Sequence, residues 1–324
     1  MVKLASAEMA EKKLATRAAF GATLAELAEE GVPVVAVDAD LTGSTTTKKF
    51  AAAAPENADK LFNCGIAEQN MIDVAAGLAL TGHVAYTGSF AVFGTGRAYD
   101  QIRNTVCYSN LDVKICPTHA GVSVGPDGGS HQMLEDVSLM RGLPNMRVLV
   151  PADYAAARAA IKLAAKTPGP VYVRMGRAAV PCVYDDDVEL EVGRAYVLRE
   201  GSDATVVACG VEIREALAAA DALAEEGISI EVIDAFSVKP LDEDTITASV
   251  AKTGCCVVAE EHSVHGGLGS AVAECLARKN PAPCEFVGVQ DRFGKSGEFE
   301  ELLGYFNLDA AAIVEAVKAA IARK

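Results

Sequence analysis

One acidic residue stands where an apolar helix is expected to begin. The stretch NCGIAEQNMIDVAAGLAL, residues 63–80, places Glu68 before apolar side chains that surround the whole helix, and such a helix is typically buried on all sides. One interpretation is a first-turn acid favoured by the helix dipole, which is a common surface arrangement. In the other, the carboxyl lies in an apolar site, where it can exchange a proton near neutral pH.

A second group of polar residues lies in the glycine-rich stretch THAGVSVGPDGGSHQ, residues 118–132. It carries His119, Asp127 and His131 between regular elements, which is where binding and catalytic residues tend to gather. The spacing of these residues matches no zinc-binding pattern, so we expect no metal ligands among them.

Further candidates follow apolar runs that are typical of strands. Phe90 and Phe93, in GSFAVFG, are either plain core or an aromatic slot for a flat ring. The stretch DADLTGS, with Asp40 and Ser44, has the composition of a simple turn. Arg174 ends the run VYVR, where an arginine either pairs with a neighbouring acid or binds a phosphate.

The elements that must position these residues alternate along the chain. Strands are expected at residues 32–40, 83–90, 113–119, 147–152 and 169–175, and helices at residues 7–30, 96–110, 133–141 and 153–166. Asp153 is placed to cap the last of these helices. Strands that alternate with helices predict a mostly parallel sheet covered on both faces, whose carboxyl edge is where ligands bind.

The alternation breaks at residues 176–194, which contain a proline, an acidic run and no helical period. We interpret this stretch as a linker, because strand and helix patterns restart after it and continue to the end of the chain. The predicted fold class is therefore α/β, with two doubly wound domains at residues 1–180 and 190–324, the second being smaller.

Composition and charge argue against several classes of partner. Of the 324 residues 51% are apolar and 23% charged, and the net charge is −15. An acidic surface of this kind disfavours nucleic acid and anionic membranes, and no apolar run is long enough to cross a bilayer. The charged, amphipathic start lacks the apolar middle of a signal peptide, and nine cysteines without a C-x-x-C pair indicate reduced thiols. We therefore expect a cytoplasmic protein.

Taken in their order, these stretches resemble the second half of transketolases. The matching stretches are DADLTGS, NCGIAEQNM, GSFAVF, THAGVSVGPDGGSHQ, LPNMRVLVPAD and VYVR. Later segments, VVAEEHSVHGGLGS and DRFGKSGEFEELLGYFNLD, resemble the C-terminal domain of the same family. The resemblance covers nearly the whole chain. It implies a pyrimidine-binding domain, a transketolase C-terminal domain and thiamine diphosphate as the cofactor.

The resemblance also implies roles for the residues that would meet this cofactor. Glu68 falls on the glutamate that shares a proton with the aminopyrimidine ring, which allows the reactive carbon of the cofactor to lose its proton. Phe90 and Phe93 fall on the residues that flank the pyrimidine. Asp40 falls on an aspartate near the cofactor.

A sugar site is implied in the same way. His119, Asp127 and His131 resemble the residues that hold the hydroxyls and carbonyl around the bond being cut, and His131 would lie near the donor carbonyl, where an imidazole can shuttle a proton. The positions that hold the terminal phosphate of the substrate are matched by Arg17, Ser44 and Arg174. The same clamp would suit another tetrahedral oxyanion, such as a sulfonate.

The chain departs from the family pattern in two places. Larger members have a tyrosine where this sequence has Gly96, so we expect Arg97 or Tyr99 to close the pyrimidine pocket differently. The GDG motif and downstream asparagine that hold the diphosphate and its Mg²⁺ (or Ca²⁺) are absent. We therefore expect one half of a split enzyme, active only with a separate N-terminal subunit in an α₂β₂ heterotetramer. His262 and His265 are expected to be structural or to lie at a subunit contact.

The predicted function is that of the C-terminal subunit of a transketolase, which moves a two-carbon ketol unit from a ketose phosphate to an aldose. One alternative is the β subunit of a 2-oxo acid dehydrogenase, which shares the fold and the glutamate but needs no sugar-phosphate clamp. A deoxyxylulose phosphate synthase-like half is another, because RAYDQ resembles that group. A third is a non-catalytic binding relative that kept the fold.

Overall fold

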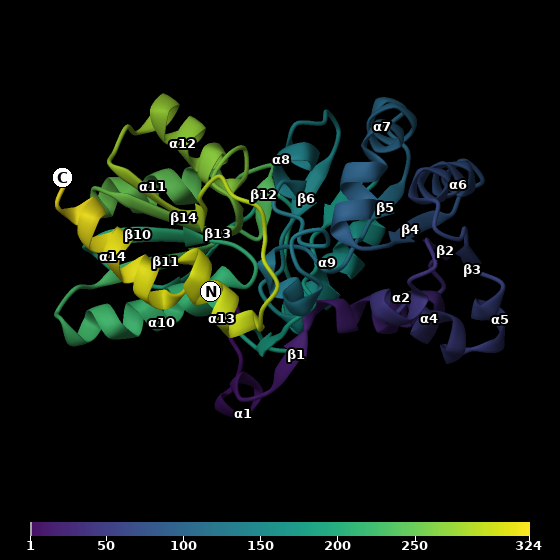
Figure 1. Cartoon of the computed structure of the whole chain (residues 1–324), viewed down its shortest axis with the longest axis horizontal. Helices are drawn as coiled ribbons and strands as arrows, with labels where there is room; N and C mark the ends of the chain where they lie inside the picture. The colour runs from purple at the N-terminus through teal and green to yellow at the C-terminus, as the bar shows by residue number, and fades with distance from the viewer. Residues whose placement is uncertain (1) are drawn as a thin grey trace.

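The computed structural model describes residues 2–324, which form two α/β halves lying side by side (Figure 1). The N-terminal half, drawn in purple to teal, lies against a C-terminal half drawn in green to yellow. No helix of the described chain is both long enough and apolar enough to span a bilayer. The predicted α/β class is confirmed.

A seven-stranded sheet organises the N-terminal half, in the order β12-β6-β7-β5-β4-β2-β3. All neighbouring strands are parallel except β12, which runs antiparallel to β6. The strands are β2 (Val34–Asp38), β3 (Leu61–Asn63), β4 (Val84–Gly88), β5 (Val113–Ile115), β6 (Arg147–Leu149), β7 (Val171–Val173) and β12 (Ser237–Lys239). Strands β2, β4, β5 and β7 are buried at every position, as expected where helices cover both faces.

Helices cover the two faces of this sheet. The helical elements of this half are α1 (Ala7–Ala10), α2 (Ala19–Glu29), α3 (Thr42–Thr45), α4 (Thr47–Ala53), α5 (Pro55–Ala58), α6 (Glu68–Leu80), α7 (Tyr99–Gln101), α8 (Asp136–Arg141) and α9 (Tyr154–Lys166), with 3₁₀ turns η1 (Thr16–Ala18) and η4 (Val122–Asp127) and π-helical segments η2 (Val92–Arg97) and η3 (Ile102–Tyr108). Helices α2 and α9 pack with Val34 and Ala36, whereas α6 and η3 pack with Val35 and Val37. This alternation along β2 is what a strand with two buried faces requires.

The C-terminal half repeats the arrangement on a five-stranded sheet, in the order β14-β13-β10-β11-β9, with only β9 antiparallel. Its strands are β9 (Tyr196–Arg199), β10 (Ala204–Ala208), β11 (Ile230–Asp234), β13 (Cys256–Ser263) and β14 (Cys284–Val289), and its helices are α10 (Glu212–Glu225), α11 (Glu243–Thr253), α12 (Leu268–Lys279), α13 (Phe299–Phe306) and α14 (Ala310–Ile321). Helices α10 and α14 lie on one face and α11 and α12 on the other (Figure 1).

The two halves are joined by a shared strand and by a continuous hydrophobic core. Strand β12 is contributed by residues that follow the predicted linker, yet it completes the sheet of the N-terminal half. The linker itself holds β8 (Ala179–Pro181), which pairs with β1 (Lys13–Ala15) near the start of the chain. The two largest hydrophobic clusters each contain residues of both halves, so the core is continuous between them.

Two local predictions are corrected. The helix expected at residues 7–30 is interrupted by β1 and η1, because Thr16 exchanges hydrogen bonds with Gly176 instead of extending the helix. Helix α6 is buried along one face only, since Asp73 and Gly77 face solvent and Leu80 is 74% exposed. The cap at Asp153 is confirmed, because its Oδ1 accepts the Ala156 N–H at 2.8 Å.

Candidate active site

Glu68 is the first residue of α6, and its side chain is only 1% exposed. The helix packs against β2 and β4, and the Glu68 carboxyl is buried at the point where the helix begins. The expectation that this acid is kept from water is confirmed. Its Oε2 accepts a hydrogen bond from Nη1 of Arg97 at 2.8 Å.

Arg97 connects this carboxylate to an aromatic surface. Its guanidinium carbon lies 4.5 Å from the centre of the Phe93 ring, a cation–π contact. Both residues belong to η2, and single π-helical turns of this kind are frequent at functional sites. Tyr99 packs against the hydrophobic core instead. Of the two residues expected to take the place of the tyrosine, only Arg97 therefore reaches Glu68.

Four rings in contact with one another form what we call the aromatic wall: Phe90, Phe93, His119 and His131. Phe90 and Phe93 are stacked with their centres 6.2 Å apart, and Phe90 stacks on His119 at 3.8 Å. His131 meets the Phe93 ring edge-on at 5.4 Å. The structure thus brings together side chains that are up to 41 positions apart along the sequence, where Phe90 forms a parallel bridge with Thr118 next to His119.

His119 begins the loop at residues 118–132, which we call the histidine loop. Its φ of +61° is unusual for a residue other than glycine, and such backbone strain clusters at functional sites. Burial, followed by the charges of Arg17 and Arg177 and by His131, lowers the pKa of His119 to about 3. The imidazole is therefore neutral at physiological pH, with its Nδ1 held 2.7 Å from the Thr118 hydroxyl.

Arg17 and Arg177 lie near His119, and Nε of Arg17 donates to the Arg177 carbonyl at 3.5 Å. Arg17 donates to the Ser44 carbonyl at 2.7 Å, and Arg177 donates to the Val124 carbonyl at 2.9 Å. Burial and then the charge of Arg177 lower the pKa of Arg17. Within residues 2–324 no carboxylate lies at ion-pair distance from either guanidinium, so the pair forms an uncompensated positive site suited to an anion.

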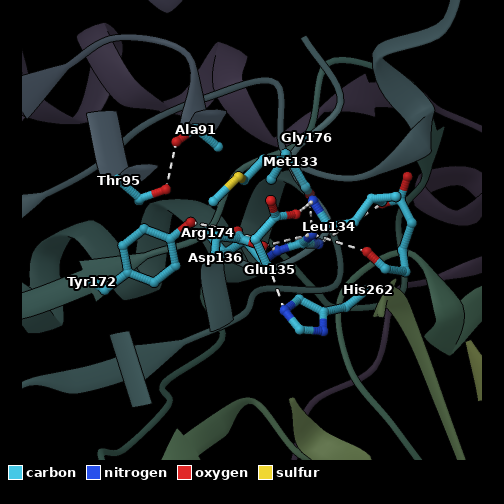
Figure 2. A network of polar contacts seen from close by, with 12 residues as sticks. Ala91, Thr95, Met133, Leu134, Glu135, Asp136, Tyr172, Arg174, Gly176 and His262 are labelled. Carbon is cyan, nitrogen blue, oxygen red and sulfur yellow. Dashed lines mark hydrogen bonds and ion pairs between the residues drawn. The ribbon is translucent and has the colours of Figure 1, made fainter. Parts of the chain in front are cut away.

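The prediction for Arg174 is corrected by its position. It is 7% exposed, its Nε donates to Asp136 Oδ2 at 2.7 Å, and its Nη2 donates to the Glu261 carbonyl at 2.9 Å. Figure 2 shows Asp136 between this arginine and Tyr172, whose hydroxyl the same carboxylate accepts. Its charge is neutralised inside the protein, and this arrangement does not fit an anion clamp.

Sequence reasoning missed Arg177, three residues beyond Arg174 in VYVRMGR. Strand β7 ends at Val173, so Arg174 still points into the interior, while Arg177 lies on the loop that follows. The signal was present in the same segment, but the length of the strand was needed to choose between the two arginines.

The remaining predicted residues make contacts outside the aromatic wall. Ser44 contributes its carbonyl to Arg17, and Asp127 is exposed at the end of η4. Asp40 has a φ of +64° and accepts a hydrogen bond from Asn63 Nδ2 at 3.1 Å. His262 is buried beside Asp136 and Glu260, as expected of a structural histidine, and His265 is exposed on the surface.

The donor set fits a flat heteroaromatic ring better than a metal ion. A buried carboxyl stands at one edge of the aromatic wall, where a ring nitrogen can meet it while the ring face lies on phenylalanine. Across residues 2–324, no cluster of three or more histidine, cysteine, aspartate or glutamate side chains is arranged to bind a metal.

Two family models match the chain. Residues 12–183 match the transketolase pyrimidine-binding domain, and residues 193–313 match the transketolase C-terminal domain.

Similar proteins include both half-length and full-length relatives. The chain is 45% identical to a putative transketolase C-terminal section of Methanocaldococcus jannaschii, covering 93% of this chain and 94% of that protein. It is 42% identical to a 6-deoxy-6-sulfo-D-fructose transketolase subunit of Clostridium sp., covering 93% and 92%. It is 37% identical to the transketolase of Homo sapiens, covering 96% of this chain but 50% of that protein.

One solved structure resembles the chain over its full length. It is described as a split gene transketolase in an inactive β₄ tetramer, is 48% identical, and superposes with a TM-score of 0.87 over 96% of this chain and 99% of that chain.

Proposed function

The chain belongs to the transketolase family, and from this premise we propose that it is the C-terminal subunit of a two-subunit transketolase. It transfers a two-carbon ketol unit from a ketose phosphate to an aldose when it is combined with a separate N-terminal subunit. The observation that carries the proposal is the buried Glu68 carboxyl beside the wall formed by Phe90, Phe93, His119 and His131.

The cofactor of this family is thiamine diphosphate, and when bound it supplies the nucleophilic carbon and the electron sink that cleavage of a ketose requires. Glu68 would hold a proton at a nitrogen of the pyrimidine ring, and its burial would keep that proton from exchanging freely with bulk water. Phe90 and Phe93 provide the flat apolar contact for the ring. Arg97 donates to Glu68 Oε2 in the isolated chain, so it would have to release this atom for Glu68 to hold the ring.

The histidines act on the sugar. The neutral imidazole of His119 can donate or accept a hydrogen bond at a substrate hydroxyl without the cost of burying a charge. His131, whose ring meets Phe93 edge-on in the aromatic wall, moves a proton at the donor carbonyl. Asp127 is free to bind a further hydroxyl from its exposed position on η4.

The terminal anion of the substrate is held by Arg17 and Arg177. The Ser44 carbonyl positions Arg17 by accepting a hydrogen bond from its guanidinium. Within residues 2–324 neither guanidinium group has a carboxylate partner, so the pair suits any tetrahedral oxyanion, which includes phosphate and sulfonate. The site is opposite in sign to the net charge of −15, so it acts as a local exception on an acidic protein. A 2-oxo acid dehydrogenase subunit would have no need for such a clamp.

The partner subunit provides the diphosphate site and its Mg²⁺ or Ca²⁺. This proposal is supported by the half-length relatives, one named as a transketolase C-terminal section and one as a transketolase subunit. The α₂β₂ assembly is supported by apolar side chains left exposed around α6, since Ile66 is 78% and Leu80 74% exposed. All nine cysteines are free, which fits a reducing compartment such as the cytoplasm.

Reconstitution tests the proposal. The purified chain is assayed for ketol transfer alone, with thiamine diphosphate and Mg²⁺, and again after mixing with the N-terminal transketolase subunit of the same organism. We expect turnover only in the mixture. Full activity of the chain alone would refute the split assembly, and a mixture that forms a complex without ketol transfer would refute the transketolase assignment.

A further inference from the structure

The C-terminal half reaches into the histidine loop through one carboxylate. Glu261, on β13, has a side chain that is 2% exposed and accepts the backbone N–H of Ser123 through Oε1. Ser123 lies on η4, between His119 and His131. The contact joins residues 138 positions apart, so it exists only because the two halves pack together.

The backbone of the loop packs closely against this carboxylate at Gly121. Gly121 has a φ of +80°, and a Cβ at this position would lie 2.2 Å from Glu261 Cδ, well inside van der Waals contact. Only glycine satisfies both the conformation and the space. The carboxylate therefore defines the path of the chain directly after His119.

A buried network holds Glu261 itself in place. Arg174 donates to the Glu261 carbonyl, and its Nη1 lies 3.9 Å from Glu261 Oε2. The same guanidinium is bound by Asp136, which also accepts the Tyr172 hydroxyl (Figure 2). Arg174 was expected in the anion clamp. It instead joins the two halves, because it contacts Asp136 in one half and Glu261 in the other.

We propose that Glu261 is a positioning residue that fixes the histidine loop, so that His119 and His131 keep their places against Phe90 and Phe93. A charged acceptor bound to a backbone N–H in a buried site forms a strong hydrogen bond, and it prevents the loop from leaving the wall. The proposal rests on the proposed function where it concerns catalysis. It gives the C-terminal half a part in the reaction.

The chain offers a matched control next to this residue. Glu260 lies on the same strand and is 2% exposed, but its carboxylate accepts the N–H groups of Leu268 and Gly269, both at 2.8 Å, at the start of α12. Among the described residues its carboxylate makes no hydrogen bond to the histidine loop. The two glutamates are thus alike in burial and charge and differ in what they hold.

The first test measures amide hydrogen exchange in the full chain for Glu261→Ala, Glu261→Gln and Glu260→Ala. We expect residues 118–132 to exchange about tenfold faster or more in Glu261→Ala, as the loss of a charge-assisted hydrogen bond implies. Glu261→Gln should recover most of the protection, because its amide oxygen can still accept the Ser123 N–H, and this variant serves if Glu261→Ala does not fold. Glu260→Ala should affect residues 268–269 instead. Equal exchange of the histidine loop in the Ala variants of Glu260 and Glu261 overturns the proposal.

The second test measures KM and kcat in the complex with the N-terminal subunit. Glu261→Ala should raise the KM for the ketose donor about tenfold, with rescue by Glu261→Gln, whereas Glu260→Ala should leave KM unchanged. An unchanged donor KM in an active Glu261→Ala complex overturns the catalytic part of the proposal. If even the wild-type complex transfers no ketol unit, the proposed function fails, and the exchange experiment still decides whether Glu261 positions the loop.

Discussion

Arg97 and Glu68 form an ion pair in which one partner is half-exposed and the other is almost completely buried: the side chains are 48% and 1% exposed. The same guanidinium covers the Phe93 ring. A single side chain therefore occupies both the carboxylate and the aromatic face that a pyrimidine would need. Binding of the cofactor and release of Arg97 are expected to be one event.

The carboxyl of Glu68 can be tested without removing its shape. Glu68→Gln should lower kcat in the reconstituted enzyme about 100-fold or more, because the amide cannot hold a transferable proton at the ring nitrogen. The melting temperature of the chain should change little, and Glu56→Gln, an exposed acid on α5, provides the control. Turnover of Glu68→Gln at the wild-type rate would contradict the mechanism.

Removing Arg97 should help the cofactor bind. An ion pair with a half-exposed partner contributes at most about 1 kcal/mol, so Arg97→Ala should tighten thiamine diphosphate binding by roughly two- to fivefold. Isothermal titration calorimetry on the assembled complex measures this directly. Weaker binding in Arg97→Ala would mean that the guanidinium contacts the bound cofactor and does not compete with it.

The two arginines of VYVRMGR should behave in opposite ways. Arg177→Ala should raise the KM for a phosphorylated donor about tenfold with no loss of stability, because no carboxylate among the described residues pairs with its guanidinium. Arg174→Ala should cost about 3–5 kcal/mol in the free energy of unfolding, because it leaves the buried Asp136 carboxylate uncompensated. Donor kinetics and urea denaturation of both variants separate the roles. For a donor without a terminal anion, Arg177→Ala should change the KM less than it does for a phosphorylated donor. This difference is the expected signature of the clamp.

Asp234 should give the chain a pH-dependent stability. Burial raises its pKa to about 7, although the Tyr184 hydroxyl, 2.6 Å from Oδ2, favours the charged form, and the charge of Asp153 adds to the rise. Between about pH 4 and pH 7 the folded state binds the proton that the unfolded state has lost, so this group makes stability fall as pH rises, by roughly 1.4 kcal/mol per pH unit.

Asp234→Asn should remove that slope. The difference in unfolding free energy between variant and wild type, measured in urea at several pH values, should grow in favour of the variant from pH 4 to pH 7 and then stay constant. A difference that is flat over this range would show that Asp234 is already ionised in the folded chain.

Local sequence patterns were enough to predict most strands, the Asp153 cap and the alternation that makes the sheets parallel, because each depends on neighbours along the chain. The one-sided burial of α6 could not be read in the same way, since apolar residues surround the helix and only the sheet decides which face is covered.

The site divides along the same line. Glu68, Phe90, Phe93 and the two histidines were predicted from the resemblance of their stretches to transketolases, and the structure brings the four rings together. The choice between Arg174 and Arg177 and the contact of Glu261 with Ser123 depend on where a strand ends and on how two distant segments pack. No periodicity in one segment carries that information.

Strand β12 has a practical consequence for anyone who divides the protein. A fragment that stops before residue 190 would lack Ser237–Lys239, and β6 would become a bare edge with unpaired backbone groups. Such edges recruit strands from other molecules. The N-terminal half expressed by itself should therefore self-associate and precipitate, even though family boundaries suggest an independent unit.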